Sequence, residues 1–147
     1  MKTKLILMAV MVTLLLAAGA CSLAMGARIP QDAALVVPSD DFSNTQQVVK
    51  EAEVAAGGTL TVTLESNPTT GFSWEETAQI TDAAILEQTG NKMLVPEGKG
   101  IVGAAGSQSF TFRALEKGLT TVKLDYSRPW EGGEKDELTC EIDVTVK

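Results

Sequence analysis

The most regular pattern in the chain is Leu138-Thr-Cys-Glu-Ile-Asp-Val-Thr-Val146, and it indicates the fold class. Apolar and polar residues alternate through it, so one face of the extended chain carries Leu138, Cys140, Ile142, Val144 and Val146. A period of two is typical of an antiparallel strand with one buried face and one solvated face. We therefore predict a strand over 138–146 in which Cys140 is buried as a small hydrophobic side chain.

The same period recurs towards the N-terminus. It is regular in residues 59–65, 110–114 and 122–126, and weaker in 47–54, 72–76 and 85–89. Seven such segments, separated by Gly, Pro and Asn, are typical of an immunoglobulin-like fold. We predict an all-β, antiparallel β-sandwich of about seven strands over residues 46–147, with Trp74 as its central buried aromatic. One helical turn is expected at 81–84, capped by Thr81 or Asp82.

The first twenty residues have the features of a secretory signal peptide. Lys2 and Lys4 precede an uncharged, mostly apolar run of 16 residues, 5–20, which is shorter than a membrane span of ~20 residues. The run ends in Ala18-Gly19-Ala20-Cys21, which resembles the lipobox of prokaryotic lipoproteins, with Ala18 where Leu is usual. We predict a leader over 1–20 and a lipid on Cys21. Plain secretion after a cut near Ala20, or an uncleaved anchor, are the alternatives.

Residues 21–45 are predicted to form a tether. Small and turn-forming residues dominate 22–30 and 38–45, and no period is sustained. The apolar run 33–37 could pair as an edge strand, but we assign it to a loop. The mature protein is thus expected to be exported and lipid-anchored in the cell envelope or periplasm, or otherwise secreted.

Composition excludes several classes of function. The chain has 147 residues, of which 44% are apolar, and this suits one globular domain. It has no histidine and two cysteines, which removes His-dependent catalysis, His-ligated metal sites and a zinc site with four thiolates. A formal charge of −7 argues against binding to nucleic-acid phosphates. We expect no cofactor, no metal ion and no nucleic-acid partner.

Three loops between the predicted strands carry unusual residues. Asn67-Pro-Thr-Thr-Gly-Phe72 combines a proline of fixed φ with a glycine that permits positive φ, so we expect a rigid turn. Residues 98–106 are glycine-rich, but they lack the Lys-Ser/Thr pair of a P-loop and lead into a strand. Ser127-Arg-Pro-Trp-Glu-Gly-Gly133 places an arginine and a tryptophan in a turn. Taken singly, each loop could be a plain connection, and Trp130 could fold back onto the sandwich.

These loops are expected at one end of the domain. They follow the second, fourth and sixth predicted strands, and in an immunoglobulin-like sandwich those connections lie at the same end. Loops held on a rigid scaffold often carry binding function. The topology therefore predicts one continuous binding surface.

The three motifs resemble those of the chagasin-like inhibitors of cysteine proteases. Asn-Pro-Thr-Thr-Gly-Phe at 67–72, Gly-Ala-Ala-Gly at 103–106 and Arg-Pro-Trp at 128–130 agree with that family's signature loops in order and approximate spacing. The resemblance covers about residues 46–147, and it fails at Ala105, where relatives often carry a second glycine. It implies an inhibitor, not an enzyme, that binds papain-like cysteine proteases reversibly and tightly in the substrate cleft.

The resemblance also implies the roles of individual residues. By it, the tip at 69–71 lies over the catalytic cysteine, residues 101–106 follow the non-primed side of the cleft, and residues 128–130 cover the primed side. The implied protease-binding residues are Asn67, Pro68, Thr69, Thr70, Gly71, Phe72, Ile101, Val102, Gly103, Ala104, Ala105, Gly106, Arg128, Pro129 and Trp130. We expect the inhibitor to act as a monomer.

Two other classes of function stay open at this point. A non-inhibitory immunoglobulin-like module of the cell envelope, used in adhesion or assembly, would have the same fold with the loops as mere connections. An enzyme is the other class, and its catalytic groups would be carboxylates. Four acidic residues cluster in one segment: Glu131, Glu134, Asp136 and Glu137. A charge run of this kind is usually a solvated surface, and it lacks the EF-hand pattern of a calcium site.

Overall fold

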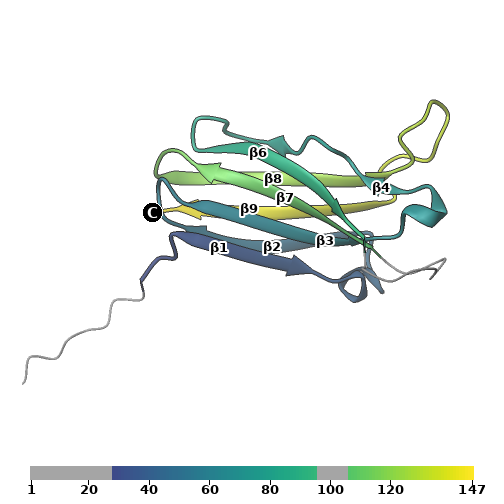
Figure 1. The fold of residues 1–147 in the computed structure, drawn as a ribbon, viewed down its shortest axis with the longest axis horizontal. Helices are drawn as coiled ribbons and strands as arrows, with labels where there is room; N and C mark the ends of the chain where they lie inside the picture. The colour runs from purple at the N-terminus through teal and green to yellow at the C-terminus, as the bar shows by residue number, and fades with distance from the viewer. Residues whose placement is uncertain (1–27, 96–105) are drawn as a thin grey trace, which may run out of the picture.

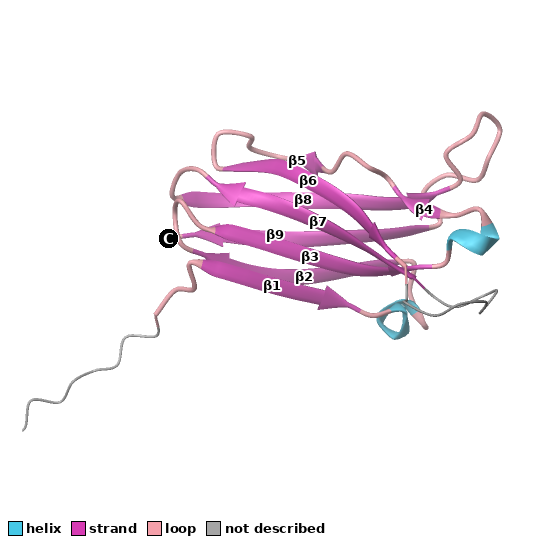
Figure 2. Ribbon diagram, viewed as in Figure 1, coloured by secondary structure: helices cyan, strands magenta, loops and turns pink. Residues whose placement is uncertain are grey.

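The computed structural model describes residues 28–95 and 106–147 of the chain. Figure 1 shows two β-sheets packed face to face, with strands along the long axis of the molecule, and Figure 2 shows two short 3-10 helical turns at one end. In chain order the elements are β1 (Asp32–Val37), η1 (Ser39–Phe42), β2 (Gln47–Val54), β3 (Thr59–Ser66), η2 (Pro68–Thr70), β4 (Ser73–Trp74), β5 (Gln79–Ile80), β6 (Leu86–Leu94), β7 (Gly106–Ala114), β8 (Gly118–Ser127) and β9 (Leu138–Val146).

The strand pairing confirms the predicted immunoglobulin-like β-sandwich. One sheet has the order β1-β3-β7-β6, and the other has the order β2-β9-β8-β4, with β5 also paired to β8. The pairs β3–β7, β6–β7, β8–β9, β4–β8 and β5–β8 are antiparallel, as predicted. At one edge of each sheet the pairing is parallel instead, β1 with β3 and β2 with β9.

Five strands match the segments that alternate in the sequence. Side chains of β3, β7, β8 and β9 alternate between buried and less buried positions, and β2 follows the weaker segment 47–54. The short segments 72–76 and 85–89 correspond to β4 and to the first part of β6. Residues 81–84 form a turn rather than a helix, and Asp82 Oδ1 accepts a hydrogen bond from the Ala84 N–H at 2.9 Å.

The assignment of residues 33–37 to a loop is wrong. They form most of β1, whose residues pair in register with β3, from Asp32 opposite Thr59 to Val37 opposite Leu64. Val37 is fully buried, and the following turn η1 brings the Phe42 ring to 5.7 Å from the Trp74 ring. The folded domain therefore includes residues 32–42, which we had placed in the tether. Local periodicity is a poor guide here because β1 is an edge strand that obtains its hydrogen bonds from β3.

The core lies between the two sheets and is centred on Trp74, as predicted. Trp74 is 1% exposed, and Phe110, Phe112 and Ile142 are fully buried around it. The indole Nε1 of Trp74 donates to the Glu65 carbonyl at 2.9 Å, and Gln108 Nε2 donates to the Trp74 carbonyl at 3.0 Å. Because its polar groups are paired, the indole can be buried without a desolvation penalty.

The two ends of the sandwich differ. The C-terminus and the first described residues lie at one end, while η1, η2 and the β8–β9 connection lie at the other (Figure 1). Among the residues that the structure describes, no helix is long and apolar enough to cross a membrane.

Candidate functional site

The loop 67–72 is held in shape by its own side chains. Asn67 Oδ1 accepts hydrogen bonds from the backbone N–H of Thr69, at 3.3 Å, and from the Thr69 hydroxyl. The Thr70 N–H and hydroxyl both donate to the Asn67 carbonyl, at 3.1 and 2.7 Å. These bonds build the short turn η2 from an Asn and two Thr, side chains that commonly bond to nearby backbone. The turn is therefore rigid, as the sequence predicts.

The scaffold fixes the base of this loop through Tyr126. The Tyr126 hydroxyl accepts a hydrogen bond from the Asn67 N–H at 3.1 Å. The Tyr126 ring stacks on Phe72, with centroids 5.5 Å apart, and contacts Trp74 with centroids 5.0 Å apart. A continuous row of aromatic rings thus connects the loop to the core. The sequence indicates Tyr126 as a strand residue shortly before the Arg-Pro-Trp motif, and its hydrogen bond to the loop is visible only in the tertiary structure.

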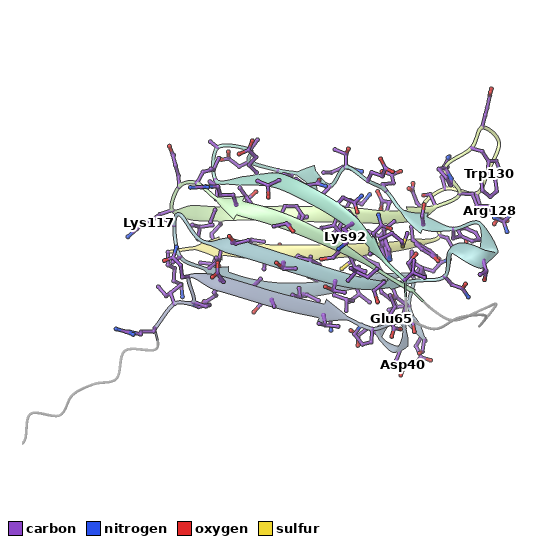
Figure 3. All side chains as sticks on the ribbon, in the orientation of Figure 1. Asp40, Glu65, Lys92, Lys117, Arg128 and Trp130 are labelled. Atoms are coloured by element: carbon purple, nitrogen blue, oxygen red, sulfur yellow. The ribbon has the colours of Figure 1, made fainter. Side chains whose placement is uncertain are left out.

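The loop 127–137 packs directly against the loop 67–72. Arg128 lies over the Phe72 ring, with Cζ 4.4 Å from the centroid, and 5.8 Å from the Trp130 ring. Gly71 has φ +80°, and a Cβ added there would lie 2.5 Å from Trp130 Cη2. Two features therefore require a glycine at position 71: the left-handed backbone, and the indole that lies over it. Figure 3 shows Arg128 and Trp130 together at the end of the sandwich that carries the loops.

Glu134 and Lys135 hold Arg128 in place within this second loop. The guanidinium of Arg128 pairs with Glu134 at 3.2 Å, and the Arg128 N–H donates to the Glu134 carbonyl at 2.8 Å. Lys135 Nζ donates to the Arg128 carbonyl at 2.6 Å. The ion pair is solvent-exposed, so its own contribution to stability is small. Its effect is to orient Arg128, a function of Glu134 that charge patterning alone did not indicate.

Several predicted contact residues project into solvent. Thr69, Thr70, Pro129 and Trp130 are exposed, and 52% of Trp130 is accessible. A large aromatic side chain held rigidly in solvent is a common feature of protein interaction sites, where Trp and Arg supply much of the binding energy. Trp130 does fold back, but onto Gly71 rather than onto the sandwich.

The third predicted loop is described only at its end. Ile101, Val102, Gly103, Ala104 and Ala105 lie outside the described residues, as does Cys21. Gly106 is the first residue of β7 and is buried opposite Ser66 at the end of β3. The strand β7 therefore begins beside the residue that precedes Asn67, at the end of the sandwich where the other two loops meet.

Cys140, as predicted, is a buried side chain and not a nucleophile. It is fully buried on β9, and burial raises the pKa of its thiol to about 12. The thiol is therefore protonated at neutral pH and inaccessible to a protease.

Comparison with known proteins confirms the family resemblance that the sequence indicates. Residues 53–145 match the model of the chagasin family of peptidase inhibitors (I42). The chain belongs to the chagasin family. As a member of a family of inhibitors it is not an enzyme, which agrees with the prediction.

Two curated relatives are similar in sequence. Amoebiasin-2 of Entamoeba histolytica is 33% identical over 88 residues, which covers 60% of this chain and 70% of that protein. Chagasin of Trypanosoma cruzi is 35% identical over 85 residues, which covers 56% of this chain and 76% of chagasin.

Two solved structures have the same fold. The cysteine protease inhibitor EhICP2 of Entamoeba histolytica has a TM-score of 0.59 at 21% identity, covering 80% of this chain and 99% of that one. PbICP-C, solved in complex with falcipain-2, has a TM-score of 0.56 at 19% identity, covering 77% and 99%.

Proposed function

We propose that this protein is a reversible, tight-binding inhibitor of papain-like cysteine proteases. It occludes the active-site cleft with three loops, at 67–72, 98–106 and 127–133. The observation that carries the proposal is the contact between Gly71 and Trp130, two motif residues distant in sequence. This contact joins two loops into one surface whose shape is set before a protease binds.

Preorganisation favours tight binding. Ordering a loop on association costs free energy, and this cost is small where the loop is already held by its own bonds. The loop 67–72 has such bonds within itself and to Tyr126. A wedge of three loops could bury about 800 Å² per partner, which is the size of an ordinary protease–inhibitor contact.

Inhibition in this proposal involves no covalent step. Cys140 is buried and its thiol is protonated, and the Thr70 hydroxyl donates to the Asn67 carbonyl. Occlusion of the cleft is then sufficient, and the protease thiol need not react. A protease whose catalytic cysteine is replaced by alanine should therefore bind with comparable affinity.

The experiment is an inhibition panel with the purified protein against papain-like, caspase-like and serine proteases. We expect competitive, one-to-one inhibition of papain-like enzymes alone, with an intact inhibitor and no adduct by mass spectrometry. Failure to inhibit any papain-like enzyme would favour the alternative, a non-inhibitory envelope module. A covalent adduct, or cleavage within 67–72 during inhibition, would replace occlusion with a substrate-like mechanism.

We further propose that the protein is exported and anchored in the cell envelope by a lipid on Cys21, after removal of residues 1–20. The described chain begins at the end of the sandwich opposite the loops (Figure 1), so an N-terminal anchor would leave the loops accessible. The test is partition of the mature protein with membranes and the mass of its N-terminal peptide. Cys21→Ser should release the protein or leave the leader uncleaved, and an unmodified Cys21 in a soluble mature protein would argue for plain secretion.

A further inference from the structure

The turn η1 is attached to the strand that leads into the loop 67–72. The Ser39 N–H donates to Glu65 Oε2 at 2.8 Å, and the Ser39 hydroxyl donates to the same oxygen. These bonds lower the pKa of the Glu65 carboxyl, so Glu65 is ionised at neutral pH. The turn lies outside the three motifs, yet it reaches the same end of the sandwich, where Figure 3 shows Asp40 and Glu65.

A notch separates η1 from the start of the loop 67–72. Its volume is about 240 Å³. Phe42, Tyr126 and Leu138 contribute apolar walls, and Glu65 and Asn67 belong to its polar part.

One polar group in this notch has no hydrogen-bond partner among the residues that the structure describes. Ser66 also lines it and is only 3% exposed, and among the described residues no group forms a hydrogen bond with Ser66 Oγ. A buried hydroxyl without a partner carries a desolvation cost, which a ligand with a donor group can offset. A hydroxyl can accept a hydrogen bond as well as donate one, so Ser66 Oγ is able to accept from a donor that enters the notch.

The charges around the notch select the kind of donor. Glu65 and Asp40 are exposed carboxylates, and Asp41 is neutralised by Lys50, whose Nζ lies 2.8 Å from Asp41 Oδ2. Apolar, aromatic walls with carboxylates beside them suit an amphipathic cationic side chain. The methylene stem of a lysine or arginine packs on such walls, and its charged head attracts both the carboxylates and the aromatic rings.

The notch lies beside the loop 67–72, at the edge of the sandwich formed by β1 and β2. The β8–β9 loop belongs to one sheet, and the strands β6 and β7 belong to the other. The turn η1 instead joins the sheets at the edge formed by β1 and β2. Because η1 lies at the end of the sandwich that carries the loops, a protease that accepts the loops in its cleft also approaches η1.

We propose that η1 is a fourth contact element, and that the notch between η1 and Asn67 receives a lysine or arginine side chain from the wall of the protease cleft. This inference rests on the proposed function and adds a basis for selectivity among papain-like proteases. Those with a basic residue at this position would be favoured, because complementary charges speed association and leave no carboxylate of the interface unpaired.

The test is a set of single-charge variants measured against papain-like proteases that the wild type inhibits. Glu65→Gln removes the carboxylate that lines the notch, and Asp40→Asn removes the carboxylate of the residue that follows Ser39, another lining residue. Ser39→Ala removes a hydroxyl donor to Glu65 but keeps both charges. Glu116→Gln removes an exposed carboxylate in the β7–β8 turn, at the far end of the sandwich. Inhibition constants and association rates are measured at low and high salt, with melting temperatures as a control of folding.

For a protease with a basic wall residue, Glu65→Gln should weaken inhibition by about tenfold or more, Asp40→Asn by less, and both losses should shrink at high salt. Replacement of the protease's basic residue by alanine should abolish the difference between wild type and Glu65→Gln. Ser39→Ala and Glu116→Gln should change inhibition by less than about twofold.

Two results would overturn the inference while leaving the proposed function intact. One is that Glu65→Gln and Asp40→Asn both inhibit the protease as strongly as the wild type does. The other is an equal loss for Ser39→Ala and Glu65→Gln that salt does not change, since this would reduce Glu65 to a structural support of the loop. If the wild type inhibits no papain-like protease, the proposed function itself fails.

Discussion

The hydroxyl of Tyr126 accepts a hydrogen bond from the backbone N–H of Asn67 at 3.1 Å, across 59 positions of sequence. This bond ties the first residue of one loop to the strand that leads into another. Since Phe72 stacks on the same ring, the scaffold holds both ends of the loop 67–72 through one side chain.

Tyr126→Phe should therefore loosen the loop while keeping the aromatic stack. We expect a stability loss of about 0.5–1.5 kcal/mol, because one hydrogen bond disappears and the Asn67 N–H must find another partner. Inhibition of papain should weaken as well. Thr121→Val is a suitable control, since it deletes a hydrogen bond to Asp143 away from the loops. Thermal unfolding and inhibition constants measure the two effects, and an unchanged inhibition constant for Tyr126→Phe would mean that this bond does not preorganise the loop.

Gly71→Ala should weaken inhibition more than any other substitution of comparable size in the loop. The new Cβ would lie 2.5 Å from Trp130 Cη2 and would also have to tolerate φ +80°. Gly132→Ala separates these causes, because Gly132 has φ +75° but no heavy atom within 4 Å of the added Cβ. Backbone strain costs about 1–2 kcal/mol in both variants. We expect at least a tenfold additional loss of affinity for Gly71→Ala, measured by calorimetric titration with papain; equal losses would remove the steric argument.

Trp74→Ala and Trp130→Ala should damage different properties. Trp74 is 1% exposed and its removal should cost roughly 3–5 kcal/mol of stability. Trp130 is 52% exposed, so Trp130→Ala should leave the melting temperature nearly unchanged and weaken protease binding by about 2 kcal/mol or more. Melting curves and inhibition constants of both variants test this division. A large loss of stability for Trp130→Ala, together with a loss of protease binding alone for Trp74→Ala, would show that the two indoles have been assigned the wrong roles.

Ionisation of the Cys140 thiol should affect only the stability of the folded protein as the pH changes. Its thiol pKa is raised from 9.0 to about 12 by burial, so the folded state holds the proton more tightly than the unfolded state does. This contribution to stability is complete below pH 9 and is lost as the pH rises towards 12. The slope can reach about 1.4 kcal/mol per pH unit. Denaturant unfolding between pH 8 and 11 should show a smaller decline for Cys140→Ala than for the wild type. If the stabilities of the two proteins declined equally with pH, the thiol would not be buried in the way that the structure shows.

A thiol-reactive reagent gives an independent measurement on the same residue. Native protein at neutral pH should leave Cys140 unlabelled, and the unfolded chain should react fully, because thiolate and access are both needed for reaction. Labelling of Cys140 in the native protein at a rate similar to the unfolded chain would contradict its burial.

Much of the sandwich could be predicted from residues that are close together in sequence. Alternation of apolar and polar side chains is a local property of an extended chain, so β3 and β9 are visible in the sequence, as is the burial of Cys140. Turn chemistry is local too. Asn67, the two Thr and Gly71 predict a rigid turn, and the motifs around them indicate the family.

The sequence-based predictions are wrong or incomplete where a residue distant in sequence determines the local structure. The strand β1 obtains its bonds from β3 and its burial from the facing sheet, so its own pattern is weak. The turn η1 depends on Glu65, and the orientation of Arg128 depends on Phe72 and Glu134. None of these pairs leaves a periodic signal, because each joins residues that only the packing of the sheets brings together.

The strand pattern, the core aromatic and the three motifs follow from neighbouring residues and their fixed spacing, so they can be recognised in the amino-acid sequence. That Trp130 covers Gly71, that Tyr126 holds Asn67 and that η1 borders a notch beside them depends on the tertiary structure. The physical reason is that strand pairing and sheet packing set distances between residues far apart in the chain, and those distances determine which loops can form one surface.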